Sequence, residues 1–366
     1  VSADLETFPV SFTAAADQLG TARLRLSAAG GGRERTREFR VETVRQKYRI
    51  MYLAGRPSPE YSALREFLKA EPNFELVSFV ILRNPENPSP APDRELSLIP
   101  FPVDQIFGPT LAQFDLFILE NFSAARFNLP PQHLEALKRF VAGGGALLVK
   151  GGDNAFSAGG YKGSPLEEVL PVALSAVRPD FVPGLFSPKP GPPDHPLVRL
   201  YETPEASRRA WDALPPLDGW AHFASVRSGA AVLASHPRES TEDGKALPIT
   251  AVRPYGRGKV MMISTDSSWR WKLGAAGDPD AAGFYARFWT RAVQYLTGSL
   301  DLSKVKFAPL PDRVLPREPA RLSLRVFDEG FSPAPAADTR LSVTWTGPDG
   351  RSREVPVRET EPGVYA

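Results

Sequence analysis

Polar residues that could do chemistry follow apolar runs at three places in the chain. These are Glu120-Asn121, Gly151-Gly152-Asp153 and Asp266-Ser267-Ser268. In an open α/β sheet, ligands and catalytic groups lie just beyond the carboxyl ends of the strands. The three places could therefore meet at one sheet edge, where carboxylates could serve as acid, base or metal ligand.

Asp153 has two interpretations. It could accept backbone N–H bonds from a following helix and act as its cap. It could instead face a pocket together with Glu120, Asn121 and Asp266, since all four residues would lie at strand ends. The cap is favoured, and the pocket remains the alternative.

A second candidate is the string Thr265–Trp271, which holds two tryptophans and an arginine. A stack of Arg270 on Trp269 or Trp271 could anchor another domain or a peptide. Alternatively, the tryptophans cover the sheet edge and Arg270 pairs with an acid. Arg56 could bind an anion, although the prolines beside it remove N–H donors.

Several kinds of site are excluded or disfavoured. The chain has no cysteine, so thiol nucleophiles, disulfides and thiolate metal sites are absent. No G-x-S-x-G motif and no phosphate-binding loop occurs. His195 lies between prolines, where ordering its own loop is a commoner role than metal ligation.

We therefore predict no catalytic residue, no metal ligand and no cofactor. The predicted pocket or interaction residues are Arg56, Glu120, Asn121, Gly152, Asp153, Asp266, Ser267, Trp269, Arg270 and Trp271.

The elements that would position these residues alternate between buried strands and amphipathic helices. This alternation predicts a mainly parallel sheet with right-handed crossovers. The expected strands are Tyr48–Gly55, Glu75–Leu82, Phe114–Leu119, 145–150, Ala230–Ser235, Ile249–Val252 and Lys259–Thr265. The expected helices are Tyr61–Leu68, one that begins at Pro130-Pro131, Leu166–Leu170 and Tyr285–Leu296, with an irregular connection over Pro183–Pro196.

Both ends of the chain show a different pattern. Residues 7–45 and the region after Val305 alternate apolar and polar residues between glycine turns, which is typical of antiparallel strands. We predict partial β-sandwich segments at 1–45 and 301–366, around an α/β domain at 46–300. The chain opens on Val1 rather than methionine, and we expect it to be a soluble piece of a longer polypeptide.

The overall charge is nearly balanced, with 44 Lys and Arg against 42 Asp and Glu. No global field therefore draws the protein to nucleic acid, and basic residues do not interleave with aromatic ones along any element. No run approaches the roughly 18 apolar residues that cross a bilayer. We expect protein partners and no nucleic acid.

Several strings in the α/β region resemble one family. They are Leu53-Ala54-Gly55-Arg56-Pro57-Ser58, Ser78–Arg83, Ser97–Pro102, Phe114-Asp115-Leu116, Gly151-Gly152-Asp153, Gly159-Gly160-Tyr161, Glu168–Val172 and Thr265–Trp271. They are similar to the glutamine amidotransferase-like domain of large bacterial membrane proteins that resemble aerotolerance proteins with von Willebrand factor A domains. The resemblance spans about residues 46–300 in unbroken order.

The resemblance implies a class I glutamine amidotransferase fold, which is flavodoxin-like with helices on both faces of the sheet. It also implies flanking immunoglobulin-like segments and a place on the periplasmic side of the bacterial inner membrane, in a membrane-anchored parent. Active members use a cysteine at a strand-to-helix elbow and a histidine with a glutamate at a later strand end. Here those positions hold Gly151-Gly152-Asp153 and Asp266-Ser267-Ser268.

The thiol and its base are both missing, so the reaction cannot be carried over. We expect a non-catalytic module that binds other domains of the same envelope protein or neighbouring membrane proteins. The alternative is a hydrolase or metal-dependent enzyme that uses Asp153, Glu120 or Asp266 at the sheet edge.

Overall fold

The structure is a computed structural model. It describes residues 20–30, 33–43, 47–81, 102–177, 180–274, 283–300, 304–307, 323–328, 333–335, 341–346 and 350–366. The chain forms two units, Val1–Lys47 and Tyr48–Ala366. In the first unit, β1 (Gly20–Gly30) pairs with β2 (Arg33–Thr43) as an antiparallel hairpin. The expected run at Phe8–Phe12 lies outside the described residues.

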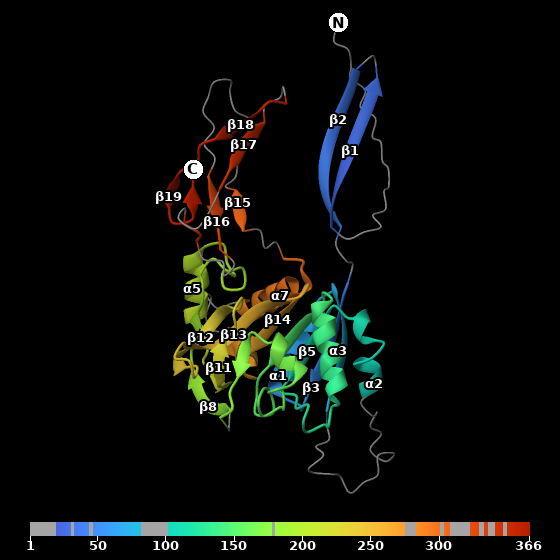
Figure 1. Cartoon of the computed structure of the whole chain (residues 1–366), viewed down its shortest axis with the longest axis vertical. Coiled ribbons are helices and arrows are strands. Elements are labelled where there is room, and N and C mark those ends of the chain that lie inside the picture. The colour runs from blue at the N-terminus through green and yellow to red at the C-terminus, as the bar shows by residue number, and fades with distance from the viewer. Residues whose placement is uncertain are drawn as a thin grey trace. The chain divides into compact units, whose positions relative to one another are not determined.

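The second unit contains an eight-stranded sheet (Figure 1). The strand order is β4 (Phe74–Val80), β3 (Tyr48–Ala54), β5 (Leu116–Glu120), β6 (Ala146–Lys150), β14 (Gly258–Ile263), β13 (Ala246–Tyr255), β12 (Ala231–Ser240) and β9 (Lys189–Pro190). The first five strands pair in parallel, and the last three extend the sheet antiparallel. The predicted mainly parallel, flavodoxin-like α/β fold is confirmed.

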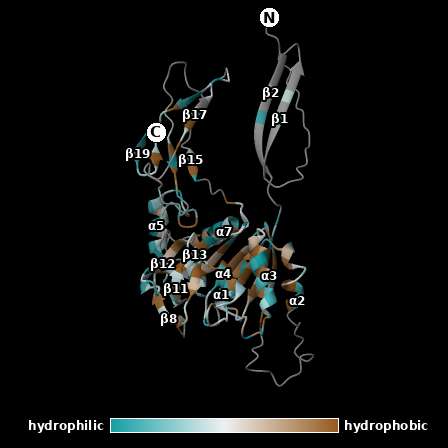
Figure 2. Ribbon diagram, viewed as in Figure 1, coloured by the Kyte–Doolittle hydropathy of each residue, from teal (hydrophilic) through white to brown (hydrophobic). Residues whose placement is uncertain are grey.

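The central parallel strands are largely apolar because both faces of the sheet are covered there. Every residue of β5 and β6 is buried, a pattern that requires packing on both sides. One group of contacting helices comprises α1 (Pro59–Ala70), α6 (Trp269–Gly274) and α7 (Phe284–Thr297), and another comprises α3 (Pro131–Ala142) and α4 (Pro165–Val169). Figure 2 shows hydrophobic residues concentrated along the strands that these helices pack against.

Some elements differ from the sequence prediction. The stretch expected to be irregular contains β9 and part of β8 (Phe181–Phe186), which pairs with β10 (Leu217–Ala221). Pro183 is tolerated there because β8 belongs to a sheet of only two strands, where a missing N–H need not break a ladder. The helix α5 (Pro204–Asp212) was not predicted, although Thr203 caps it with its side chain.

The remaining elements are short. The helix α2 (Val103–Ile106) and the 3-10 helix η1 (Leu111–Gln113) precede β5, and β7 (Val172–Leu174) pairs with β11 (Phe223–Val226). Near the C-terminal end, β15 (Val305–Phe307), β16 (Leu324–Val326), β20 (Val364–Tyr365) and β19 (Glu359–Glu361) form one sheet, and β17 (Val343–Thr346) pairs with β18 (Ser352–Val355). The immunoglobulin-like character of the flanks and the boundary at residue 300 remain predictions.

Two glycines let the strand ends approach one another closely. A Cβ atom on Gly55 would lie 2.1 Å from the carbonyl oxygen of Asn121, and one on Gly151 would lie 2.2 Å from that of Ser264. Both neighbours are backbone atoms, which cannot rotate out of the way. The loops that follow β3 and β6 therefore depend on glycine for their position.

The first prediction follows from this packing. We expect Gly151→Ala to destabilise the chain by about 3 kcal/mol, because β6 and β14 must separate to admit the methyl group. The matched control is Gly163→Ala, where a left-handed φ of 71° is strained but no atom lies within 4 Å. Its expected cost is about 1 kcal/mol. Urea unfolding compares the two variants, and equal losses would contradict the close-approach argument.

Candidate functional site

An open pocket of about 440 Å³ lies at the carboxyl end of the parallel strands. Its wall is formed by the loop after β3, the turn after β6, the segment after β14, and parts of β8 and β10. The residues that line it include Arg56, Ser58, Asp153, Phe181, Asp218, Asp266, Ser267, Trp269 and Arg270. The predicted sheet edge therefore carries a real cavity.

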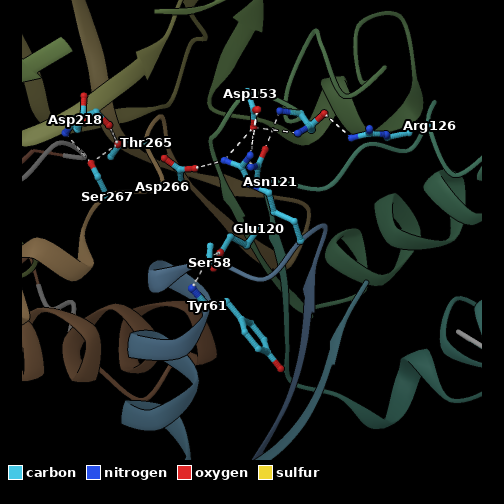
Figure 3. A network of polar contacts seen from close by, with 12 residues as sticks. Ser58, Tyr61, Glu120, Asn121, Arg126, Asp153, Asp218, Thr265, Asp266 and Ser267 are labelled. Carbon is cyan, nitrogen blue, oxygen red and sulfur yellow. Dashed lines mark hydrogen bonds and ion pairs between the residues drawn. The ribbon is translucent and has the colours of Figure 1, made fainter. Parts of the chain in front are cut away.

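Arg56 joins two of the predicted carboxylates. Its guanidinium group lies 3.2 Å from Asp153 and 3.4 Å from Asp266. The amide of Asn121 donates to Asp153 Oδ1 at 2.9 Å (Figure 3). Burial raises the pKa of Asp266, and the charge of Arg56 opposes that rise. The arginine thus holds the two carboxylates together.

Asp153 is not a helix cap, which corrects the favoured interpretation. The residues after it form turns, and the next helix, α4, is capped by Ser164. The carboxylate of Asp153 accepts from side chains instead, namely Arg56, Asn121 and Asn154. Its position matches the alternative interpretation, in which Asp153 faces a pocket.

Glu120 does not share the open pocket with Asp153 and Asp266. Its side chain is 1% exposed and accepts hydrogen bonds from Tyr52 and from Ser58, the latter at 2.7 Å. Glu120 is the last residue of β5. Because successive residues of a strand point to opposite faces of the sheet, a residue at a strand end can point away from the pocket, as Glu120 does.

The aromatic string divides between the pocket and the core. Trp269 and Arg270 line the pocket, with the guanidinium carbon 5.9 Å from the ring centroid of Trp269. Arg270 also donates to the carbonyl oxygen of Pro216 at 2.6 Å, rather than to an acid. Trp271 is 2% exposed and packs edge-to-face on Trp211, inside the core.

A side chain at Gly152, in the turn after β6, would collide with Asn121. Gly152 has a φ of 129°, and a Cβ atom there would lie 2.3 Å from the side-chain Cγ of Asn121. Asn121 itself has a positive φ of 43°. The carboxamide of Asn121 therefore fills the space above the elbow.

The hydroxyl of Ser267 is also taken up by hydrogen bonds within the fold. Its hydroxyl accepts from the backbone N–H of Asp218 at 2.8 Å and lies 2.7 Å from the hydroxyl of Thr265. None of the four histidines lines the pocket. His195 accepts from the backbone N–H of Leu197 at 3.1 Å, which is the loop-ordering role expected for it.

A buried charged cluster beneath the pocket was not predicted from the sequence. Lys150 and Glu60 are both completely buried and form an ion pair. Glu60 also accepts from the hydroxyl of Ser268 at 2.5 Å and from the backbone N–H of Trp269 at 2.8 Å. The ammonium group of Lys150 lies 4.6 Å from the ring centroid of Trp289.

The sequence held one signal for this cluster. Lys150 ends the strand Ala-Leu-Leu-Val-Lys, whose other residues are all apolar. A lysine in such a strand is almost never buried without a partner. Its partner Glu60 is 90 positions away, in the first turn of α1.

Glu120 lies next to this cluster, and its ionisation depends on it. Burial raises the pKa of Glu120 to about 7, against the attraction of Lys150, while the nearby charge of Glu60 adds to the rise. Hydrogen bonds from Tyr52 and Ser58 oppose it. Burial likewise raises the pKa of Tyr52 well above its ordinary value.

Among the described residues, no group of three or more His, Asp or Glu side chains is arranged to hold a metal ion. Within the same residues, none of the helices combines the length and apolar character that a bilayer crossing requires.

The parallel sheet, its two groups of helices and the pocket at its carboxyl edge define an α/β protein of the flavodoxin-like class. Residues 113–298, just over half of the chain, match the family model described as "Putative glutamine amidotransferase". The chain belongs to this family.

Solved structures with similar folds are distant in sequence. A cytoplasmic protein of Salmonella typhimurium is 18% identical over 75% of this chain and 96% of its own, with a TM-score of 0.44. A second one, from strain LT2, is 19% identical over the same shares, with a TM-score of 0.45. A protein of Bacteroides uniformis described as "thua-like" is 10% identical over 70% of this chain and 94% of its own, with a TM-score of 0.41. No curated protein matches the chain.

The second prediction concerns the buried ion pair. We expect Lys150→Met to destabilise the chain by about 3–5 kcal/mol, because it leaves Glu60 buried without a counter-charge. The matched control is Lys138→Met, which removes a lysine whose partner Glu168 is 58% exposed. Solvent screens that pair, so the loss should be much smaller. Chemical denaturation of both variants checks this, and similar losses would contradict it.

Proposed function

We propose that this chain is a non-catalytic, glutamine amidotransferase-like binding module. The observation that carries the proposal is the elbow after β6, where the space for a nucleophile is occupied by the carboxamide of Asn121. Thiolate attack on an amide needs a cysteine and a base. The chain has no cysteine, and none of its histidines lines the pocket.

The pocket supports a binding role. Phe181 and Trp269 offer apolar surface, and Asp218 and Arg270 offer polar groups beside it. Cavities of a few hundred Å³ with mixed walls of this kind are typical ligand sites. The Arg56 bridge fixes the wall between the β3 and β6 loops before any ligand arrives. The ligand is then a small polar molecule or a side chain of a protein partner.

The proposed setting is the periplasmic side of a bacterial inner membrane, within a membrane-anchored parent protein with immunoglobulin-like flanks. The support for this setting is the resemblance of the strings around Arg56, Asp153 and Trp269 to the domain in such envelope proteins. The partners would be other domains of the same protein or neighbouring membrane proteins.

An enzymatic role for the carboxylates is the competing proposal. Asp153 and Asp266 do line the open pocket. However, both accept hydrogen bonds from the guanidinium group of Arg56, so fewer of their oxygen lone pairs are free to bind a metal ion or a substrate proton. The binding role is therefore favoured.

The third prediction tests catalysis directly. We expect no ammonia release when the purified chain is incubated with glutamine, measured by a coupled assay against a buffer blank. Release above the blank that is lost in Asp153→Ala would instead establish an enzyme that works without a thiol. Either result separates the two proposals.

The fourth prediction tests the pocket. In a thermal-shift screen of amino acids, sugars and short peptides, we expect the shift caused by a true pocket ligand to be lost in Trp269→Ala and reduced in Asp266→Asn. The matched control is Asp212→Asn, an exposed acid on α5 outside the pocket. A hit that survives both pocket substitutions binds elsewhere, and a screen with only such hits would contradict the pocket assignment.

A further inference from the structure

Two buried carboxylates hold the pocket wall from below. Ser58 and Trp269 both line the pocket. The hydroxyl of Ser58 donates to Glu120 at 2.7 Å, and the backbone N–H of Trp269 donates to Glu60 at 2.8 Å. The position of each of these loops is therefore tied to a group that solvent does not reach.

The cluster has one cation for two carboxylates. Glu60 and Lys150 are 0% exposed, and Glu120 is 1% exposed. Among the described residues, the other titratable groups that face Glu120 are the hydroxyls of Tyr52 on β3 and Tyr285 on α7, which cannot carry a positive charge. A second buried negative charge without its own counter-charge is costly, so the fold favours keeping a proton on the cluster.

The charges beyond Ser58 do not relieve this imbalance. Arg56 lies on the pocket side, where Asp153 and Asp266 already accept from it. Burial raises the pKa of Glu120 to about 7. The proton that the cluster retains is thus lost within the physiological range.

The hydroxyl of Ser58 must respond to this proton. Its oxygen accepts the backbone N–H of Tyr61 at 2.9 Å, which caps α1. When Glu120 is ionised, the single hydroxyl hydrogen of Ser58 points to Oε1. When Glu120 is protonated, Tyr52 still donates to Oε2, so the added proton lies on Oε1 and donates to Ser58. The hydrogen of Ser58 must then turn away, toward the pocket that Ser58 lines.

We propose that Glu120 and Ser58 form a proton-controlled hydrogen-bond donor in the pocket. Protonation of Glu120 presents the Ser58 hydroxyl to a ligand, and ionisation withdraws it. The ligand favoured at lower pH is one that places an acceptor oxygen, such as a carboxylate or carbonyl, beside Ser58. This inference rests on the proposed binding role, but the proton switch itself exists without a ligand.

The linkage has a defined sign. A carboxyl group with a raised pKa in the folded state contributes stability that is fully present below its unfolded pKa. That stability is lost as the pH rises through about 7. The variant Glu120→Gln stays neutral, can donate to Ser58 and can accept from Tyr52, so it reproduces the protonated arrangement at every pH.

The fifth prediction uses the backbone amide of Tyr61 as a reporter in NMR spectra of the whole chain between pH 5 and 9. We expect its resonance to titrate with a midpoint near 7 and to stay constant in Glu120→Gln. The matched control is the amide of Leu166, which also donates to a capping serine, Ser164. The hydroxyl of Ser164 donates to the carbonyl oxygen of Tyr161, which cannot titrate.

The proposal would be overturned if the Tyr61 resonance of Glu120→Gln titrated as it does in the wild-type chain. It would also be overturned if that resonance did not titrate in the wild-type chain. If Glu120→Gln does not fold, Tyr52→Phe provides the second test. It removes a hydrogen bond to the ionised carboxylate and should raise the midpoint by about one pH unit. An unmoved midpoint would count against Glu120 as the titrating group.

Formate is the probe for the pocket half of the proposal. It should shift the Tyr61 resonance further at pH 6, where the hydroxyl faces the pocket, and leave it unchanged at pH 8. A titrating amide without any formate response would overturn the pocket-facing hydroxyl while leaving the wider binding role to the thermal-shift screen. The two proposals can therefore fail separately.

Discussion

The structure depends on placing a lysine between two glutamates where water does not reach. Lys150 closes the central strand β6, Glu60 opens helix α1, and Glu120 ends β5. Removing such groups from water is expensive, and only good geometry compensates for it. The cluster therefore fixes the relation between the sheet, the helix and the pocket loops above them. An apolar set of the same size would fill the space but would not hold Ser58 and Trp269 in place.

The existence of the pocket and its chemistry depend on different features of the chain. The cavity exists because parallel strands end at one edge, whatever residues follow them. The chemistry would depend on two particular side chains, and at the elbow the chain has Gly152 beneath the carboxamide of Asn121. The acids that remain, Asp153 and Asp266, are bridged by Arg56. These contacts support the proposed binding role.

Much of the fold could be predicted from the sequence because strands covered on both faces are almost entirely apolar, as β5 and β6 are before their last residues, Glu120 and Lys150. β8 was missed because its Pro183 and Gly184 are poor strand residues. In the site, the position of the sheet edge was predictable. The burial of the Glu120 side chain was not, because a shift of one residue along the strand decides which face of the sheet a side chain points to. The pairing of Lys150 with Glu60 required knowledge of tertiary structure.

The packing of Gly152 against Asn121 limits how a thiol could be introduced into this chain. A cysteine in place of Gly152 would collide with the carboxamide, and a smaller residue in place of Asn121 would leave Asp153 with one amide donor, Asn154, instead of two. Each single change is harmful before the other is made. Placing a thiol at Gly152 would therefore take two coupled substitutions, and an active thiol would need a catalytic base in addition.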